Sequence, residues 1–208
     1  MNQNQILEKF LQKKLLPLIS SGSKEKIKET LQQQSKIYID GTEQPVRRPV
    51  NEQEQKDNYS GKKKRHTSKI LIVSDEDKST SVITPVYVGK THDFAMFKEE
   101  KLIDALPPKT PVYTDNGFEG LDKLREDIEI RKPKKKRKKK KLNGGEQLGN
   151  RLISRERIKI EHAIGGIKRF KIVSDIFRGI SHSMDKTMEI ACGLWNFHIK
   201  KNAEIVAR

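Results

Sequence analysis

Three carboxylates in this chain of 208 residues stand where the backbone could bring them together. Asp40 ends a short alternating run, 36–40, and Asp115 ends a second one, 111–115. Ligand sites gather at the ends of strands in α/β sheets. Glu161 lies further along, in a stretch with helical periodicity. If the three side chains converge, their hard oxygen atoms form a set of ligands that suits Mg²⁺ or Mn²⁺.

Each of these acids also has a purely structural interpretation. An aspartate followed by a glycine or by Asn-Gly is ordinary turn chemistry. Glu161 between Arg157 and Lys168 is an ordinary pattern of surface charges on a helix. At 100° per residue, however, these three side chains fall within about 40° of one another, beside an apolar stripe. Taken together, the three acids predict a metal-dependent site, and two ions held there could act on a phosphodiester.

The charge of the chain indicates the same class of substrate. There are 44 lysines and arginines against 28 acids, a net charge of +16. Residues 131–141 read RKPKKKRKKKK and hold ten of those charges, which leaves +6 for the rest. Such a chain is expected to bind a polyanion, most commonly nucleic acid. Because like charges repel, we also expect a disordered, solvated loop near 131–146.

The elements that must position these residues alternate along the chain. The patterns predict strands at 36–40, 69–74, 82–88, 111–115 and 127–131, and helices at 93–106, 119–126, 147–170 and 183–201. Residues 43–66 read mainly as loop, and Pro85 predicts an edge strand or a bulge. The fold class is therefore α/β, a mixed sheet flanked by helices. We interpret His92-Asp93 as a helix start capped by Asp93 rather than as a metal-binding pair.

The ends and the composition limit the remaining options. Residues 1–35 contain helical patterns at 5–19 and 24–34 and are expected to form a helical arm, with the main domain at 36–208. The single cysteine, Cys192, excludes a disulfide framework and a cysteine-rich zinc site. No aliphatic run is long enough for a transmembrane helix, so we expect no membrane partner and a cytoplasmic protein.

Four short motifs, in the same order, resemble the catalytic domain of DDE transposases from bacterial insertion sequences, which has a ribonuclease-H-like fold. The resemblance runs from about Tyr38 to His198. The motifs are Ile39-Asp40-Gly41-Thr42 with Pro45 and Arg48-Pro49, Tyr113-Thr114-Asp115-Asn116-Gly117-Phe118, Arg157-x₃-Glu161-x₆-Lys168, and Leu194-Trp195-Asn196-Phe197-His198.

The resemblance implies a complete reaction. Asp40, Asp115 and Glu161 would be the catalytic residues and would bind two Mg²⁺ (or Mn²⁺) ions. A metal-activated water would cut the transposon end, and the freed 3′-OH would attack target DNA. Arg157 and Lys168 would hold the transposon end near the metals. Less specific, salt-dependent phosphate contacts would come from two basic runs: Lys62, Lys63, Lys64, Arg65, Lys135, Lys136 and Arg137.

Relatives of this kind usually begin with a helix-turn-helix region that recognises the terminal repeats. Only about 35 residues precede the first strand here, so we expect a catalytic domain without that region. Its partners would be double-stranded DNA, at transposon ends and target, and either a second copy or a helix-turn-helix protein from an upstream frame. We expect it near the bacterial nucleoid. One alternative is a catalytically inactive, truncated transposase that regulates by binding DNA or the full-length enzyme. Another is a basic RNA- or ribosome-associated protein with structural acids.

Overall fold

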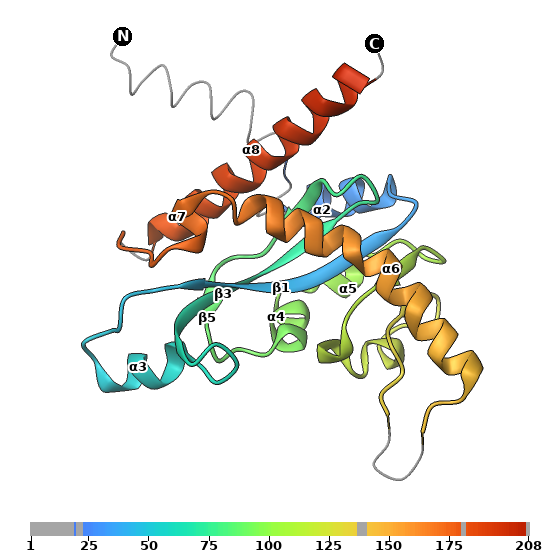
Figure 1. Ribbon diagram of the computed structural model, residues 1–208, viewed down its shortest axis with the longest axis horizontal. Helices are drawn as coiled ribbons and strands as arrows, with labels where there is room; N and C mark the ends of the chain where they lie inside the picture. The colour runs from blue at the N-terminus through green and yellow to red at the C-terminus, as the bar shows by residue number, and fades with distance from the viewer. Residues whose placement is uncertain (1–18, 20–22, 137–140, 180–181, 207–208) are drawn as a thin grey trace.

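Alternating apolar residues build a mixed sheet at the centre of the molecule. The computed structural model describes residues 19, 23–136, 141–179 and 182–206 (Figure 1). The strands follow the order β2-β3-β1-β6-β7, with β4 and β5 also paired to β3. β1 pairs antiparallel with β3 and parallel with β6, and β6 pairs parallel with β7. The strands are β1 (Ile37–Pro45), β2 (Tyr59–Ser60), β3 (Arg65–Ser74), β4 (Thr80–Ile83), β5 (Tyr87–Val88), β6 (Pro111–Tyr113) and β7 (Glu129–Arg131).

Helices cover both faces of this sheet. Tyr38, Ile70 and Ile72 pack on one face, whereas Ile39 and Leu71, one residue out of step, pack on the other. The Tyr38 face is covered by α6 (Gly144–Ile167), α7 (Lys171–Ser174) and α8 (His182–Val206). The other face is covered by α2 (Lys24–Gln32), α4 (Asp93–Glu99) and α5 (Leu102–Ala105). This confirms the expected fold class, and the arrangement is consistent with a ribonuclease-H-like fold.

The long helix α6 is fixed at its start and along one side. Asn143 and Glu146 form a reciprocal capping box at its N-terminus. Within the predicted apolar stripe, Ile160, Ala163 and Ile167 are buried, and Ile153 and Ile164 are half-buried. Near its end, Gly166 faces Trp195 of α8 so closely that a Cβ would lie 2.3 Å from the indole ring. The absence of a side chain at Gly166 therefore lets α6 pack closely against α8.

Several element boundaries differ from the predictions. The expected loop 43–66 contains the end of β1, helix α3 (Glu52–Asn58) and β2. Helix α3 buries no residue, so it leaves no hydrophobic periodicity to detect. The expected strand 82–88 divides into β4 and β5 around Pro85. The expected helix 93–106 breaks at Lys101, whose φ is 53°.

The remaining differences lie at the ends of elements. Short 3₁₀ turns, η3 (Asn116–Phe118) and η4 (Leu121–Lys123), stand near the expected helix 119–126. The basic loop is shorter than expected, because β7 takes Arg131 and α6 begins at Gly144. Apart from Ile19, the predicted helix 5–19 lies outside the described residues. Among the residues that are described, no helix is both long and apolar enough to cross a bilayer.

Candidate active site

The parallel pairing of β1 and β6 places Asp40 beside Asp115. Tyr38 of β1 is the register partner of Tyr113 of β6, and their rings stack with centroids 5.0 Å apart. Each aspartate comes two residues later on its own chain segment. Because the side chains of a strand alternate between faces, a step of two residues returns to the same face. The two sequence motifs therefore meet through strand register.

A third carboxylate joins them from α4. Asp93 is the first residue of that helix, and one oxygen each of Asp40, Asp93 and Asp115 lie within 4.8 Å of one another. We call these three residues the acid cluster. The N-cap is His92, which makes no side-chain capping bond, so the prediction that Asp93 caps the helix is wrong. The side chain of Asp93 points into the cluster, with the Lys69 Nζ atom 3.2 Å from its Oδ1 atom.

Two glycines leave room for these carboxylates. A Cβ at Gly41 would lie 2.6 Å from the Oδ1 atom of Asp93, so only glycine admits that side chain beside β1. The Gly117 N–H donates a hydrogen bond of 2.7 Å to Asp115, and a Cβ there would lie 2.8 Å from the accepting oxygen. The glycine that follows each motif aspartate thus shapes the site as well as the turn.

Asp40 is held in an environment that does not fully neutralise it. Its Oδ1 atom accepts a hydrogen bond from the Gly41 N–H at 2.8 Å, and the Arg157 Nη2 atom lies 3.5 Å from its Oδ2 atom. Burial raises the pKa of Asp40 to about 6. Arg157 opposes this shift, whereas the carboxylates of Asp115 and Asp93 add to it. A cation bound at this point would remove the repulsion among the three acids.

The donor chemistry of the acid cluster fits a hard divalent cation. All three side chains offer carboxylate oxygens, the ligands that Mg²⁺ and Mn²⁺ prefer. They come from three separate elements, β1, α4 and the turn after β6, which are fixed by the sheet. The arrangement could therefore hold a metal ion where β1, the turn after β6 and the start of α4 meet.

Glu161 lies next to the acid cluster but not within it. It is an exposed residue of α6 and lines a pocket of about 250 Å³ together with Asp40, Gly165 and Lys168. Lys62 and Lys63 complete the basic side of this pocket, which we call the lysine pocket. The structure thus brings Glu161 to a pocket that Asp40 shares.

A comparison with known proteins identifies the family. The sequence model of the DDE superfamily endonucleases matches residues 39–196, a range that includes all three aspartates and Glu161. The chain belongs to the DDE superfamily endonucleases. It is 31% identical over 184 residues to a probable transposase for insertion sequence element IS702 from Microchaete diplosiphon. The match covers 88% of this chain but only 63% of that protein. No solved structure matches the chain.

In this DDE domain, the two predicted transposon-end contacts have different surroundings. Arg157 points at Asp40, and its side chain is only 16% exposed. Lys168 is the C-cap of α6 and lines the lysine pocket. Burial, together with the nearby Lys63, lowers the pKa of Lys168, and the carboxylates of Glu43 and Asp40 partly oppose that shift.

The first basic run of the DDE domain follows β2 and faces the site only in part. Lys62 and Lys63 are exposed and line the lysine pocket. Lys64, with a φ of 55°, is exposed in the same turn. Arg65 lies at the start of β3 and borders a neighbouring pocket with Lys63 and Lys168.

The second basic run is partly neutralised by the protein itself. The Lys135 Nζ atom lies 2.6 Å from Glu119, and Lys132 is paired with Asp122 at 2.5 Å. Lys136 is exposed, and Arg137 lies outside the described residues. The run at 62–65 is therefore the one that adjoins the acids.

Proposed function

We propose that this chain is the catalytic part of an insertion-sequence transposase that cleaves DNA and joins the cut strand to a target in a metal-dependent reaction. The observation that supports it most is the acid cluster, three carboxylates from separate elements within 4.8 Å in a chain of the DDE endonuclease family. The chain spans under two thirds of the IS702 relative, so the activity of a whole transposase is part of the proposal.

The metal ligands would be Asp40 and Asp115, with Asp93 beside them and Glu161 completing the set from α6 across the lysine pocket. Two Mg²⁺ or Mn²⁺ ions bound there would activate the attacking oxygen and stabilise the leaving oxygen of the phosphodiester. The raised pKa of Asp40 supports this assignment, because burial, with added repulsion from Asp115 and Asp93, makes its charged form costly until a cation binds.

The other residues would hold the reactants. Arg157 orients the Asp40 carboxylate from 3.5 Å. Lys62, Lys63 and Lys168 would bind the phosphates on either side of the scissile bond, because they line the pocket that Asp40 shares. The substrate would be double-stranded DNA, first at the transposon end and then at the target. A second copy, or a helix-turn-helix protein from an upstream frame, would supply recognition of the terminal repeats.

The test compares Asp115→Asn with Asp77→Asn, a matched change at an exposed turn away from the acid cluster. The substrate is a supercoiled plasmid carrying the ends of the element, incubated with and without Mg²⁺. We expect Mg²⁺-dependent nicking by the wild type and Asp77→Asn, none by Asp115→Asn, and equal DNA binding by all three. Wild-type protein that binds these ends yet stays inert with Mg²⁺ would instead support the regulatory alternative. A clear preference for RNA at matched salt would contradict both.

A further inference from the structure

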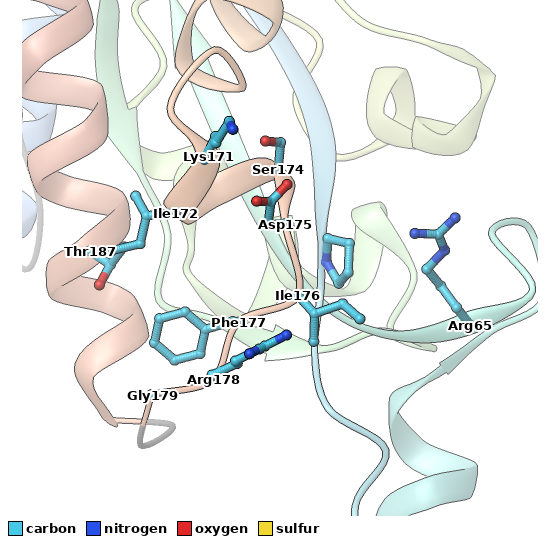
Figure 2. A pocket seen from close by; sticks show the side chains of 11 residues that line it. Arg65, Lys171, Ile172, Ser174, Asp175, Ile176, Phe177, Arg178, Gly179 and Thr187 are labelled. Carbon is cyan, nitrogen blue, oxygen red and sulfur yellow. The ribbon is translucent and has the colours of Figure 1, made fainter.

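A second hollow lies at the far end of β1 from Asp40. It has a volume of about 820 Å³ and is bordered by Arg65 on one side and by residues 171–179 on the other. Figure 2 shows Arg65 across from the extended segment that carries Ile176 and Arg178, with Lys171 above. We call this hollow the β1 groove.

The walls of the β1 groove are attached to the strand that bears Asp40. The Phe177 N–H donates a hydrogen bond of 2.8 Å to the Pro45 carbonyl, and Phe177 forms a parallel bridge with Val46. The Gln44 side chain donates to the Ile172 carbonyl at 2.5 Å. Pro45 comes five residues after Asp40, which corresponds to about 17 Å along a strand. The groove therefore stands at a fixed distance from the acid cluster.

Adjoining pockets connect the two places. The β1 groove shares Pro45, Arg65 and Ser174 with a pocket of about 190 Å³. That pocket shares Lys63 and Lys168 with the lysine pocket, where Asp40 lies. A path thus runs from the acids to the groove, with Lys63, Lys168 and Arg65 along it and Glu43 as the carboxylate that both connecting pockets share.

The lining of the β1 groove suits a strand of nucleic acid. It contains three cations, Arg65, Lys171 and Arg178, against one carboxylate, Asp175. None of the three cations forms an ion pair with any residue that the structure describes, unlike Lys132 and Lys135 of the basic run at 131–141.

Apolar side chains lie between these cations. The exposed fractions of Ile172 and Ile176 are 58% and 51%, so the groove offers apolar contact beside its positive charge. Backbone phosphates can take the charges, and proteins also place aliphatic side chains such as isoleucine against unstacked bases. In a fully paired duplex, no base would be free to pack against these isoleucines.

We propose that the β1 groove binds the DNA strand that leaves the acid cluster, with its phosphates on Lys171 and Arg178 and an unpaired base on Ile172 and Ile176. This inference rests on the proposed function, because it takes the scissile phosphate to lie at the acid cluster. For a strand that keeps the duplex rise of about 3.4 Å per nucleotide, 17 Å corresponds to about five nucleotides from that phosphate, and a more extended strand covers it in fewer.

The first test removes the two cations that the proposed active site does not use. Lys171→Ala/Arg178→Ala is compared with Lys24→Ala/Lys28→Ala on α2, which removes the same charge from the opposite face of the sheet. The probe is duplex DNA from an element end with a five-nucleotide single-stranded tail. We expect the slope of log binding constant against log salt to fall by about 1.5 to 2 in the groove variant and to stay unchanged in the control.

The second test concerns the contact between an unpaired base and the exposed isoleucines Ile172 and Ile176. With 2-aminopurine placed at each tail position in turn, we expect a fluorescence change on wild-type binding centred near the fifth nucleotide. Ile176→Asn should abolish it while the circular dichroism spectrum and melting temperature stay close to those of the wild type. Ile205→Asn, at an exposed position of α8, is the control. No change at any position would overturn the assignment of a base to this groove.

The outcomes separate the two proposals. If the wild type nicks DNA with Mg²⁺ and the groove variant keeps the salt slope of its control, the groove inference is wrong and the proposed function stands. If the wild type binds tailed DNA through the groove but never cleaves it, the proposed function fails alone. If the groove variant changes only the sedimentation of the protein, the groove is a contact between copies of the chain, and the inference is likewise wrong.

Discussion

Two contacts between β1 and α6 differ in how completely they are satisfied. Tyr38 and Asp40, two residues apart on the strand, meet Glu156 and Arg157, adjacent residues on the helix. Glu156 accepts a hydrogen bond from the Tyr38 hydroxyl at 2.6 Å, with the Lys159 Nζ atom at 3.0 Å. The pKa of Glu156 is lowered to about 2, mainly by the hydrogen bond from Tyr38 and to a smaller extent by the one from Lys159.

Asp40 shows the opposite shift in nearly the same place. It is partly buried, its single arginine lies 3.5 Å away, and two further carboxylates face it. Its pKa is raised to about 6 rather than lowered. Where partners surround a carboxylate, that carboxylate stabilises the fold. Where acids gather with too few cations, the fold gives up stability, and such places are candidates for ligand binding.

Substitutions at the two contacts should differ most in their effect on DNA nicking. Asp40→Asn should reduce Mg²⁺-dependent nicking by at least about 100-fold, because even the loss of an outer-shell partner of a metal costs up to that much. Glu156→Gln should leave nicking within about threefold of the wild type, because Glu156 belongs to the satisfied contact. Initial rates at saturating Mg²⁺ measure both. Equal losses in the two variants would erase the distinction.

The contact between Tyr38 and Glu156 should matter for the stability of the fold rather than for activity. Tyr38→Phe should lower the free energy of unfolding by about 1.5–3 kcal/mol, the usual value of a hydrogen bond to a charged group. Urea titration followed by circular dichroism measures it. Tyr113→Phe is the control, because its ring stacks on Tyr38 and, among the described residues, its hydroxyl makes no hydrogen bond. A loss below about 0.5 kcal/mol for Tyr38→Phe would show that the Glu156 contact does not stabilise the fold.

The two carboxylates should also give the stability opposite pH dependences. The folded-state pKa of Asp40 lies above its ordinary value of 3.8, so the folded state holds that proton more tightly. Its contribution to stability therefore falls as the pH rises from about 4 to about 6, by on the order of 3 kcal/mol. Asp40→Asn should accordingly be more stable than the wild type at pH 7 without metal.

The contribution of Glu156 has the other sign. Its folded-state pKa lies below its ordinary value of 4.5, so the contribution is present above that pH and is lost as the pH falls toward about 2. Thermal melts of the wild type, Asp40→Asn and Glu156→Gln across pH 2.5–7.5 resolve the two terms. An Asp40→Asn variant less stable than the wild type at pH 7 would contradict the account of the acid cluster.

The sequence was sufficient to predict the two aspartates of the site and the helix of Glu161, although the prediction that Asp40 ends its strand is wrong, because β1 runs on to Pro45. Asp40 and Asp115 follow alternating runs, and the strand register between those runs brings them together. The apolar stripe of α6 was predicted from a period of 3.6, and Ile160, Ala163 and Ile167 of that stripe are buried. These features depend on local periodicity, which a single sequence displays directly.

Asp93 was missed because the same dipeptide fits two structures. An aspartate at a helix start is usually a cap, and only the packing of α4 against the sheet turns this one toward Asp40. The available signals were the His92-Asp93 pair and the absence of a side chain at Gly41. Helix α3 was missed for a different reason, since a helix that buries nothing has no apolar face.

The smallest expected effect concerns the two glycines near the end of α6. Gly165 has no atom within 4 Å of an added Cβ, so Gly165→Ala should stabilise the protein by up to about 1 kcal/mol through helix propensity. Gly166→Ala should destabilise it, because the Cβ would collide with Trp195. Chemical denaturation of both variants measures the pair. The same sign for both would mean that α6 is not packed on α8 as described.

We propose that the acid cluster binds divalent cations, as metal-dependent DNA cleavage would require. Calorimetric titration of Mn²⁺ into the wild type, Asp40→Asn and Glu156→Gln tests it most directly, because it needs neither the terminal repeats nor a partner protein. We expect saturable binding by the wild type and by Glu156→Gln, and loss of that binding in Asp40→Asn. Binding by Asp40→Asn equal to that of the wild type would contradict the claim.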